Sequence, residues 1–339
     1  MGRDAVTSTD VARRAAVSQS AVSRVFTPGA SVSAAMREKV MQAAVELGYR
    51  PNVLARSLIT RRSRIIGVVV AYLDNQYYPV ALEMLCNVLQ QRGYHILVFM
   101  ASQTHGDLDH VLQEILDYQV DGIVMASVSM SSDLAAQCDA AGVPVVLFNR
   151  TQDDERLCAV TSDNFAGGRD VAWFLVAAGH QRIAYIAGWE GASTNRDREA
   201  GFMQGLKEAG VGLFDRSVGD YDFEGARRAA RELFQRPAEW RPDAVFVAND
   251  HMAVAVMDTL RHELGLKVPD DVSVIGYDDV PQAAWPSFDL TTVRQPTDEM
   301  VAATVRILLD RIERGVNTPQ RVALQGPLIA RGSARKPEV

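Results

Sequence analysis

The chain opens with three segments whose hydrophobic positions recur at helical spacing. The first two have their apolar positions at Val11, Ala12 and Ala15, and at Ala21, Val22 and Val25. Thr7 or Ser8 can cap the first segment and Ser18 the second, while the third runs from about residue 33 to 47 and stops at Gly48. Two short helices joined by residues 16–17, the second with a wholly polar outer face, predict a helix-turn-helix.

From residue 65 onward, short apolar runs alternate with amphipathic segments of helical length. The runs form two series, 65–71, 95–100, 122–126 and 144–148, then 183–187, 244–248 and 272–275. Strands that alternate with helices predict parallel sheets of βαβ units, and two series predict two lobes. Residues 297–314 predict a further helix, and 331–339 a loop. The predicted fold is an all-α head (1–50), a linker (51–64) and a two-lobed α/β body (65–339).

Charge separates the same parts of the 339-residue chain. Its formal net charge is −7, yet residues 1–64 hold 11 Lys and Arg against 4 Asp and Glu, a balance of +7. A small basic head on a large acidic body is expected where one end approaches a polyanion such as DNA.

Cysteine use and hydropathy indicate the compartment. Cys86, Cys138 and Cys158 are an odd number without metal-ligand spacing, which predicts buried thiols in a reducing compartment. The charged N-terminus does not resemble a signal peptide, and no apolar stretch reaches the length of a membrane span. These features predict a cytoplasmic protein without metal or cofactor.

Five stretches of the head and linker carry a resemblance to a known family: TDVARRAAVS (9–18), AVSRV (21–25), REKV (37–40), ELGYRPN (46–52) and LARSL (54–58). Together they resemble the DNA-binding headpiece of the LacI/GalR family of bacterial repressors. The resemblance implies that Gln19, Ser20 and Arg24 read bases, and arginine can indeed bind guanine through two hydrogen bonds. The alternative is a solvated surface helix. One departure is Ala16, where the family usually has a glycine that suits a positive φ.

Further DNA contacts follow from the same resemblance. Phosphate contacts are expected at Thr7, Ser18 and Ser23. The linker resembles the family's hinge helix, with DNA contacts at Asn52, Ala55, Arg56 and Leu58. Leu58 stands where the family inserts a leucine wedge between base pairs of the minor groove, which bends the duplex. The alternative is that Leu54 and Leu58, four residues apart, dock this segment on the body.

The body is similar to the periplasmic sugar-binding fold that the family carries behind its headpiece. The matching motifs are DNQYY (74–78), SDN (162–164), REAGF (198–202), GDY (219–221), VAND (247–250), IGYDD (275–279) and LTTVRQP (290–296). The resemblance implies a ligand cleft at the carboxyl ends of the strands, with Arg198, Asp278, Asn249 and Tyr221 in its wall. Aromatic faces for a sugar ring are expected from Tyr77, Tyr78, Tyr221 and Trp285. As an alternative, Asp278 and Asn249 cap neighbouring helices, a role equally open to Asp163 and Asn164. Asn149 stands where many relatives have aspartate.

No catalytic motif supports an enzyme, since phosphate-binding and nucleophile-elbow patterns are absent from the sequence. We therefore interpret the chain as a transcriptional repressor that binds a palindromic operator as a homodimer and responds to a small effector, a sugar or sugar derivative. Two alternatives are a transporter's solute-binding protein, which would lack the head, and an architectural DNA-binding protein that ignores small molecules.

Overall fold

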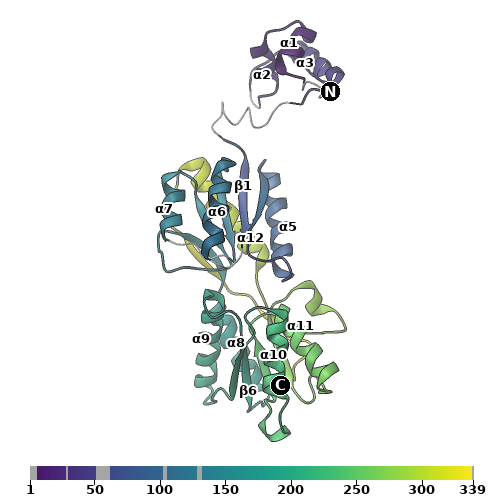
Figure 1. Ribbon diagram of the computed structural model, residues 1–339, viewed down its shortest axis with the longest axis vertical. Helices are drawn as coiled ribbons and strands as arrows, with labels where there is room; N and C mark the ends of the chain where they lie inside the picture. Colours follow the sequence, from purple (N-terminus) through teal and green to yellow (C-terminus); the bar gives the residue numbers. More distant parts are fainter. Residues whose placement is uncertain (1–5, 28–29, 51–61, 102–104, 128–131, 338–339) are drawn as a thin grey trace. The chain divides into compact units, whose positions relative to one another are not determined.

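The structure is a computed structural model that describes residues 6–27, 30–50, 62–101, 105–127 and 132–337. The chain divides into two compact units, Met1–Ser63 and Arg64–Val339, and each is described by itself (Figure 1). The first unit comprises the head and most of the linker, and we call the second unit the body.

In the part of the head that the structure describes there are three helices, α1 (Ser8–Ala15), α2 (Gln19–Val25) and α3 (Ala34–Leu47). Their starts are those predicted from the sequence, because Thr7, Ser18 and Ser33 each accept a backbone N–H of the first turn. A small core of aliphatic side chains holds the three together, and Val11, Val22 and Val40 are fully buried in it. Ala16 ends α1 in the left-handed region, at φ 53° and ψ 46°.

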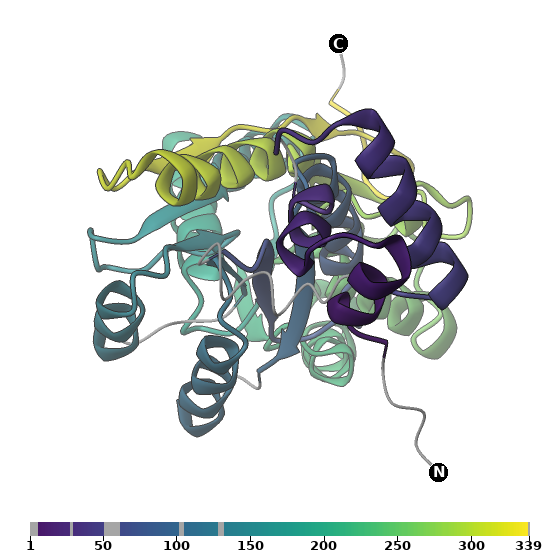
Figure 2. The ribbon, with the colours of Figure 1, turned by 90° about the horizontal axis from the view of Figure 1, so that it is seen from above.

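The first lobe of the body is built on a six-stranded sheet in the order β11-β5-β4-β3-β1-β2, with every pair parallel. Its strands are β1 (Ile65–Val70), β2 (His95–Met100), β3 (Gly122–Ala126), β4 (Val145–Phe148), β5 (Cys158–Ser162) and β11 (Arg321–Leu324). Its helices are α5 (Tyr77–Gln91), α6 (His105–Asp117), α7 (Ser132–Ala140) and α12 (Thr297–Arg314). Alternate strand residues pack toward opposite faces, so that α6 and α7 cover one face while α5 and α12 cover the other (Figure 2).

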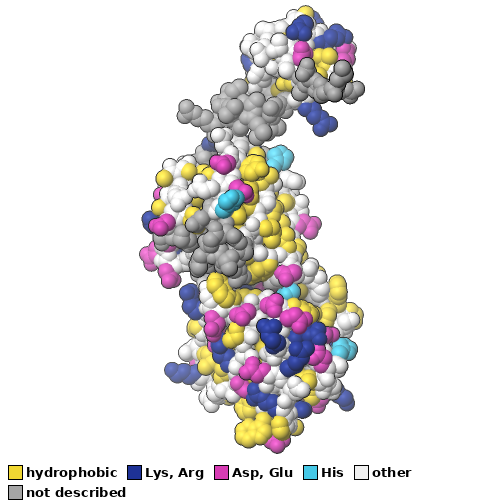
Figure 3. All heavy atoms as spheres, in the orientation of Figure 1, with side chains coloured by type: hydrophobic (Ala, Val, Ile, Leu, Met, Phe, Trp, Pro, Cys, Tyr) yellow, Lys and Arg dark blue, Asp and Glu magenta, His cyan; other side chains and the backbone are white. Residues whose placement is uncertain are grey.

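The second lobe has a six-stranded sheet in the order β12-β10-β9-β8-β6-β7, in which β12 is antiparallel to β10 and the other pairs are parallel. Its strands are β6 (Ile183–Ala187), β7 (Asp215–Val218), β8 (Ala244–Val247), β9 (Ser273–Asp278), β10 (Thr291–Arg294) and β12 (Leu328–Ile329). Its helices are α8 (Asn164–Ala177), α9 (Ser193–Glu208), α10 (Phe223–Phe234) and α11 (Asp250–Asp258), with short turns η1 (Ala238–Trp240), η2 (Thr259–Glu263) and η3 (Pro281–Ala284). Figure 3 shows basic and acidic side chains intermixed over the visible face of this lobe, and ion pairs such as Arg231 with Glu263 (2.8 Å) hold such side chains together.

The chain passes between the two sheets three times, after β5, after β10 and after β11. Within the described residues, every strand and helix predicted from the sequence is present, with ends that differ by a few residues at most, whereas the predicted hinge helix lies outside those residues. The sequence analysis missed the short strands β5, β7, β10, β11 and β12. Three of these, β5, β10 and β11, lead into crossovers, which bring the carboxyl ends of the two sheets face to face.

Candidate functional site

The head presents a polar face on α2. Gln19, Ser20, Ser23 and Arg24 are exposed, whereas Ala21, Val22 and Val25 of the same helix are buried. This division arises because successive helical residues are rotated by about 100°. Among the head residues that the structure describes, Arg24 forms no ion pair with a carboxylate, in contrast to Arg13 and Arg14, which pair with Asp10 and Glu46. The guanidinium of Arg24 is therefore available to a ligand.

Two of the three hydroxyls predicted to meet phosphates, those of Thr7 and Ser18, already cap helices, while Ser23 lies exposed within α2. Thr7 accepts the backbone N–H of Asp10 and donates to its carboxylate at 2.7 Å, and Ser18 accepts from the backbone of Ala21 at 3.2 Å. Both remain exposed at helix N-termini, where partial positive charge favours an anion. The remaining predicted DNA contacts, Asn52, Ala55, Arg56 and Leu58, lie outside the described residues.

The carboxyl ends of the two sheets meet at a small polar cavity, which we call the cleft. Ten residues line it: Tyr72, Asn75, Tyr78, Asn149, Arg150, Thr194, Arg198, Tyr221, Asn249 and Asp278. They come from segments after β1 and β4 in the first lobe, and from α9 and the ends of β7, β8 and β9 in the second. The enclosed space is about 10 Å³, roughly what one water molecule needs. A sugar-sized ligand therefore requires the lining side chains to move apart.

Arg198 is the central cation of the cleft and is only 2% exposed. Its Nε donates to Asn164 at 2.8 Å, its Nη1 to the carbonyl of Ala248 at 2.6 Å, and its Nη2 lies 3.5 Å from Oδ1 of Asp278. Its guanidinium also stacks over the Tyr277 ring, 3.7 Å from the centroid. Burial alone would lower the pKa of Arg198, but the neighbouring charge of Asp278 raises it above the ordinary value. Arg198 therefore stays charged and fixes the geometry of the second lobe.

Asp278 lies at the end of β9 with φ 125°, a conformation that L residues rarely adopt. Its Oδ1 accepts from Nε2 of Gln295 at 2.7 Å, and Asn75 of the first lobe also hydrogen-bonds its side chain. Asp250 lies nearby, fully buried, and accepts from Thr292 (2.6 Å) and from the backbone of Val280 (3.0 Å). Burial, and for Asp250 the nearby charge of Asp278, raises the pKa of both carboxyls above the ordinary range.

The sequence analysis left open whether some of the polar residues near the cleft cap helices instead of binding a ligand. Asn249 caps α11, since its Oδ1 accepts from the backbone of Met252 at 3.0 Å, and Asp163 caps α8 through Ala166 at 2.9 Å. Asp278 does not start a helix and bonds Gln295 and Arg198 instead. Asn249 combines both features, because it caps a helix and lines the cleft.

Two predicted cleft residues lie elsewhere. Tyr77 is buried in the first-lobe core, where its ring stacks on Phe148 and its hydroxyl points at the sulfur of Met300, 3.8 Å away. Neighbours on a helix point about 100° apart, so only Tyr78 of the pair reaches the cavity. Trp285 is 53% exposed and does not line the cavity.

Five lining residues were missed by the sequence analysis: Tyr72, Asn75, Asn149, Arg150 and Thr194. Four of them bond across the cavity wall. Nη2 of Arg150 donates to Tyr72 and Nδ2 of Asn149 donates to Tyr78, both at 3.0 Å, while the hydroxyls of Thr194 and Tyr221 are 3.1 Å apart. Their place in the sequence could have identified Tyr72 and Asn149 as cleft residues, because both follow the carboxyl ends of buried strands in a parallel sheet.

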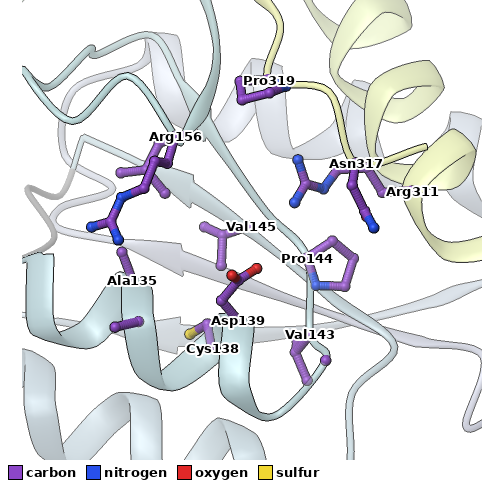
Figure 4. A pocket seen from close by; sticks show the side chains of 13 residues that line it. Ala135, Cys138, Asp139, Val143, Pro144, Val145, Arg156, Arg311, Asn317 and Pro319 are labelled. Atoms are coloured by element: carbon purple, nitrogen blue, oxygen red, sulfur yellow. The ribbon is translucent and has the colours of Figure 1, made fainter. Parts of the chain in front are cut away.

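A larger hollow of about 510 Å³ lies in the first lobe, lined among others by Cys138, Asp139, Arg156 and Arg311 (Figure 4). It includes residues just before β4 and therefore lies away from the carboxyl ends of the strands. None of the predicted site residues that the structure describes lines it.

A three-helix head with a polar outer face on its second helix, joined to a two-lobed body with a polar cleft, defines a ligand-responsive DNA-binding regulator. Residues 7–52 match the model of bacterial regulatory proteins of the lacI family, and residues 172–334 that of the periplasmic binding protein-like domain. The chain belongs to the lacI family of bacterial regulatory proteins, whose members are transcriptional regulators and not enzymes.

Relatives match along nearly the whole chain. The HTH-type transcriptional regulator CelR of Thermobifida fusca is 34% identical, with 95% of this chain and 96% of the relative covered. The ribose operon repressor of Escherichia coli K12 is 33% identical, with 96% and 98% covered. Among solved structures, the lac repressor dimer bound to operator and the anti-inducer ONPF aligns with a TM-score of 0.87 at 28% identity, with 97% of this chain and 99% of that chain covered. Within the described residues, no helix is long and apolar enough to cross a membrane.

Proposed function

We propose that this protein is a repressor that binds a palindromic operator as a homodimer and is controlled by a sugar or sugar derivative bound in the cleft. The observation that carries the proposal is the convergence of polar side chains from both lobes on one cavity. Tyr78 and Asn75 approach from the first lobe, and Arg198, Asn249 and Asp278 from the second. A ligand that touches both lobes can favour one arrangement of the lobes over another.

On the DNA side, Gln19, Ser20 and Arg24 read base edges in the major groove, which their exposure on α2 supports. Thr7, Ser18 and Ser23 contact phosphates, and Asn52, Ala55, Arg56 and Leu58 make the linker's contacts. A dimer doubles these contacts and matches a two-fold operator. The structure of a lac repressor dimer on its operator supports this arrangement. Binding to chromosomal DNA implies a cytoplasmic location.

On the effector side, amide, carboxylate and guanidinium groups suit the hydroxyls of a sugar, and Tyr78 and Tyr221 supply ring faces. Known structures of related proteins include a CelR–cellobiose complex, which supports the sugar class. The effector must shift the populations of two lobe arrangements. A shift from about 1:99 to 99:1 requires that the effector bind one arrangement more tightly by about 5.5 kcal/mol, so several of its contacts must differ between the two arrangements.

The test uses an operator selected from random DNA and fluorescence anisotropy with and without candidate sugars. Asn249→Ser retains a capping hydroxyl for α11 but removes the amide from the cleft, so it should shift the effector midpoint at least tenfold and leave ligand-free DNA affinity unchanged. Asp222→Ser is the matched control, because Asp222 caps α10 through Gly225 and does not line the cleft. If Asn249→Ser responds at the wild-type midpoint, Asn249 is not an effector contact. If no sugar alters operator affinity, the proposed regulation of DNA binding by a sugar is wrong.

A further inference from the structure

Arg150 is a buried arginine of the cleft whose hydrogen-bonding groups are mostly unused. It follows β4 and is 3% exposed. Its Nη2 donates to Tyr72, and its guanidinium carbon lies 5.5 Å from the centre of the Trp189 ring. Its Nε and Nη1 are buried and have no acceptor. Among the described residues no carboxylate forms an ion pair with it, unlike Arg198, which meets Asp278.

The charges of the cavity wall do not balance. The ten lining side chains include two arginines and one carboxylate, Asp278. Asp278 lies at 3.5 Å from Arg198, so the charge left over is that of Arg150. The neighbouring residue is Asn149, which is neutral. Its amide donates to Tyr78, while its buried Oδ1 has no donor.

A buried cation without a counter-charge opposes folding, and so does a buried N–H without an acceptor. A protein retains such a group at a binding site where the ligand supplies what is missing. At this site the missing partners are a negatively charged acceptor for Arg150 and a hydroxyl or amine donor for Asn149.

We propose that the effector is a hydroxylated anion, either a sugar acid or a sugar phosphate, whose anionic group binds Arg150 and one of whose hydroxyls donates to Asn149. The proposal rests on the effector function proposed above and narrows its ligand class. Guanidinium groups bind carboxylates and phosphates through charge-assisted hydrogen bonds, so Arg150 suits both anions.

The first test needs no ligand. Arg150→Gln removes the uncompensated charge and keeps an amide that can bond Tyr72, so the full-length protein should melt about 2 °C higher or more at neutral pH. Arg198→Gln should melt lower, because it breaks three bonds and leaves Asp278 without its cation. If Arg150→Gln lowers the melting temperature as Arg198→Gln does, Arg150 is part of the fold and the proposal is overturned.

The second test uses matched ligands in a thermal-shift assay: galactose with galacturonate, glucose with glucuronate and glucose 6-phosphate, and ribose with ribose 5-phosphate. At least one anion should stabilise the wild type while its neutral parent does not, and Arg150→Gln should weaken that anion at least tenfold. Arg196→Gln is the control, because it removes the same charge from an exposed arginine of α9 that pairs with Asp197. Comparison of the sugar acids with the sugar phosphates in this panel shows which of the two classes of anion the protein binds.

The outcomes separate this inference from the proposed function. A neutral sugar that binds wild type and Arg150→Gln equally overturns the anion preference and leaves the repressor function intact. An anion that binds through Arg150 but leaves operator affinity unchanged supports the anion preference and overturns the proposed regulation of DNA binding by the effector. A panel in which no member shifts the melting temperature overturns both assignments of ligand class.

Discussion

Nε2 of Gln295 donates a 2.7 Å hydrogen bond to Oδ1 of Asp278, and this bond joins the cleft to the start of α12. The helix has 18 residues and is about 27 Å long. In its last turn, Glu313 lies 3.3 Å from Nη1 of Arg64 and accepts from the Tyr94 hydroxyl at 3.2 Å. Arg64 is the first residue of the body. Helix α12 thus connects the cleft to Arg64, where the linker ends and the body begins.

Glu313→Gln should reduce the effector-induced change in operator affinity about two- to fivefold, because partly exposed ion pairs contribute up to about 1 kcal/mol. Effector affinity itself should stay within about twofold of wild type, since Glu313 does not line the cleft. Glu299→Gln, an exposed change in the first turn of α12, is the control. Operator titrations with and without effector measure the coupling, and an unchanged ratio in Glu313→Gln would show that this contact does not transmit it.

Arg24→Ala should weaken binding to the selected operator by about 1 to 3 kcal/mol and relax the preference at one base position. Arg14→Ala removes the same charge from a residue that pairs with Glu46, and it should lower affinity for all sequences alike. Binding-site selection with both variants makes the comparison. An identical consensus for wild type and Arg24→Ala excludes base reading by Arg24.

Leu58→Ala should reduce DNA bending and weaken specific binding if Leu58 enters the minor groove, because the unstacked base step is lost. The melting temperature of the body and effector affinity should not change. Leu54→Ala serves as the control, and bend angles from gel mobility provide the measurement. A normal bend in Leu58→Ala would favour the alternative in which this leucine docks on the body.

Ala16→Gly should stabilise the head by about 1 kcal/mol, since a side chain at φ 53° is strained and glycine is not. Hydrogen exchange of the α1 and α2 amides in the full chain reports the change, with slower exchange expected. Ala21→Gly should have the opposite effect, because Ala21 is buried inside α2. Faster hydrogen exchange in Ala16→Gly would contradict the prediction that the backbone at Ala16 is strained.

The contribution of Asp250 to the free energy of unfolding should fall as pH rises from about 4 to 7. Burial raises the pKa of Asp250 to about 7, so the native state keeps a proton that the unfolded chain releases near pH 3.9. Asp250→Asn should be stabilising at pH 7.5 and should flatten this slope, which urea titrations at pH 5 and 7.5 measure. Asp298→Asn, an exposed change, should leave the slope as it is, and an equally steep slope in Asp250→Asn would contradict the prediction.

Local patterns in the sequence were sufficient for most elements. The caps and apolar spacing of the head predicted α1, α2 and α3, because helix starts depend on neighbouring residues. The missed strands are short and depend on distant partners. β11, for example, alternates exposed and half-buried residues and pairs with β5, which lies about 160 residues earlier in the chain.

The amino-acid sequence alone determined that a helix-turn-helix precedes a two-sheet α/β body, and it identified Arg198, Asp278, Asn249, Tyr78 and Tyr221 as cleft residues to be tested. Only the tertiary structure decided that Tyr77 packs in the core while Tyr78 faces the cleft, because that choice depends on how α5 is rotated against its sheet. It also decided that Arg198 has its counter-charge, whereas no carboxylate of the described residues pairs with Arg150. Charge balance in a buried site depends on which side chains converge from distant segments, and hydrophobic patterning does not record that.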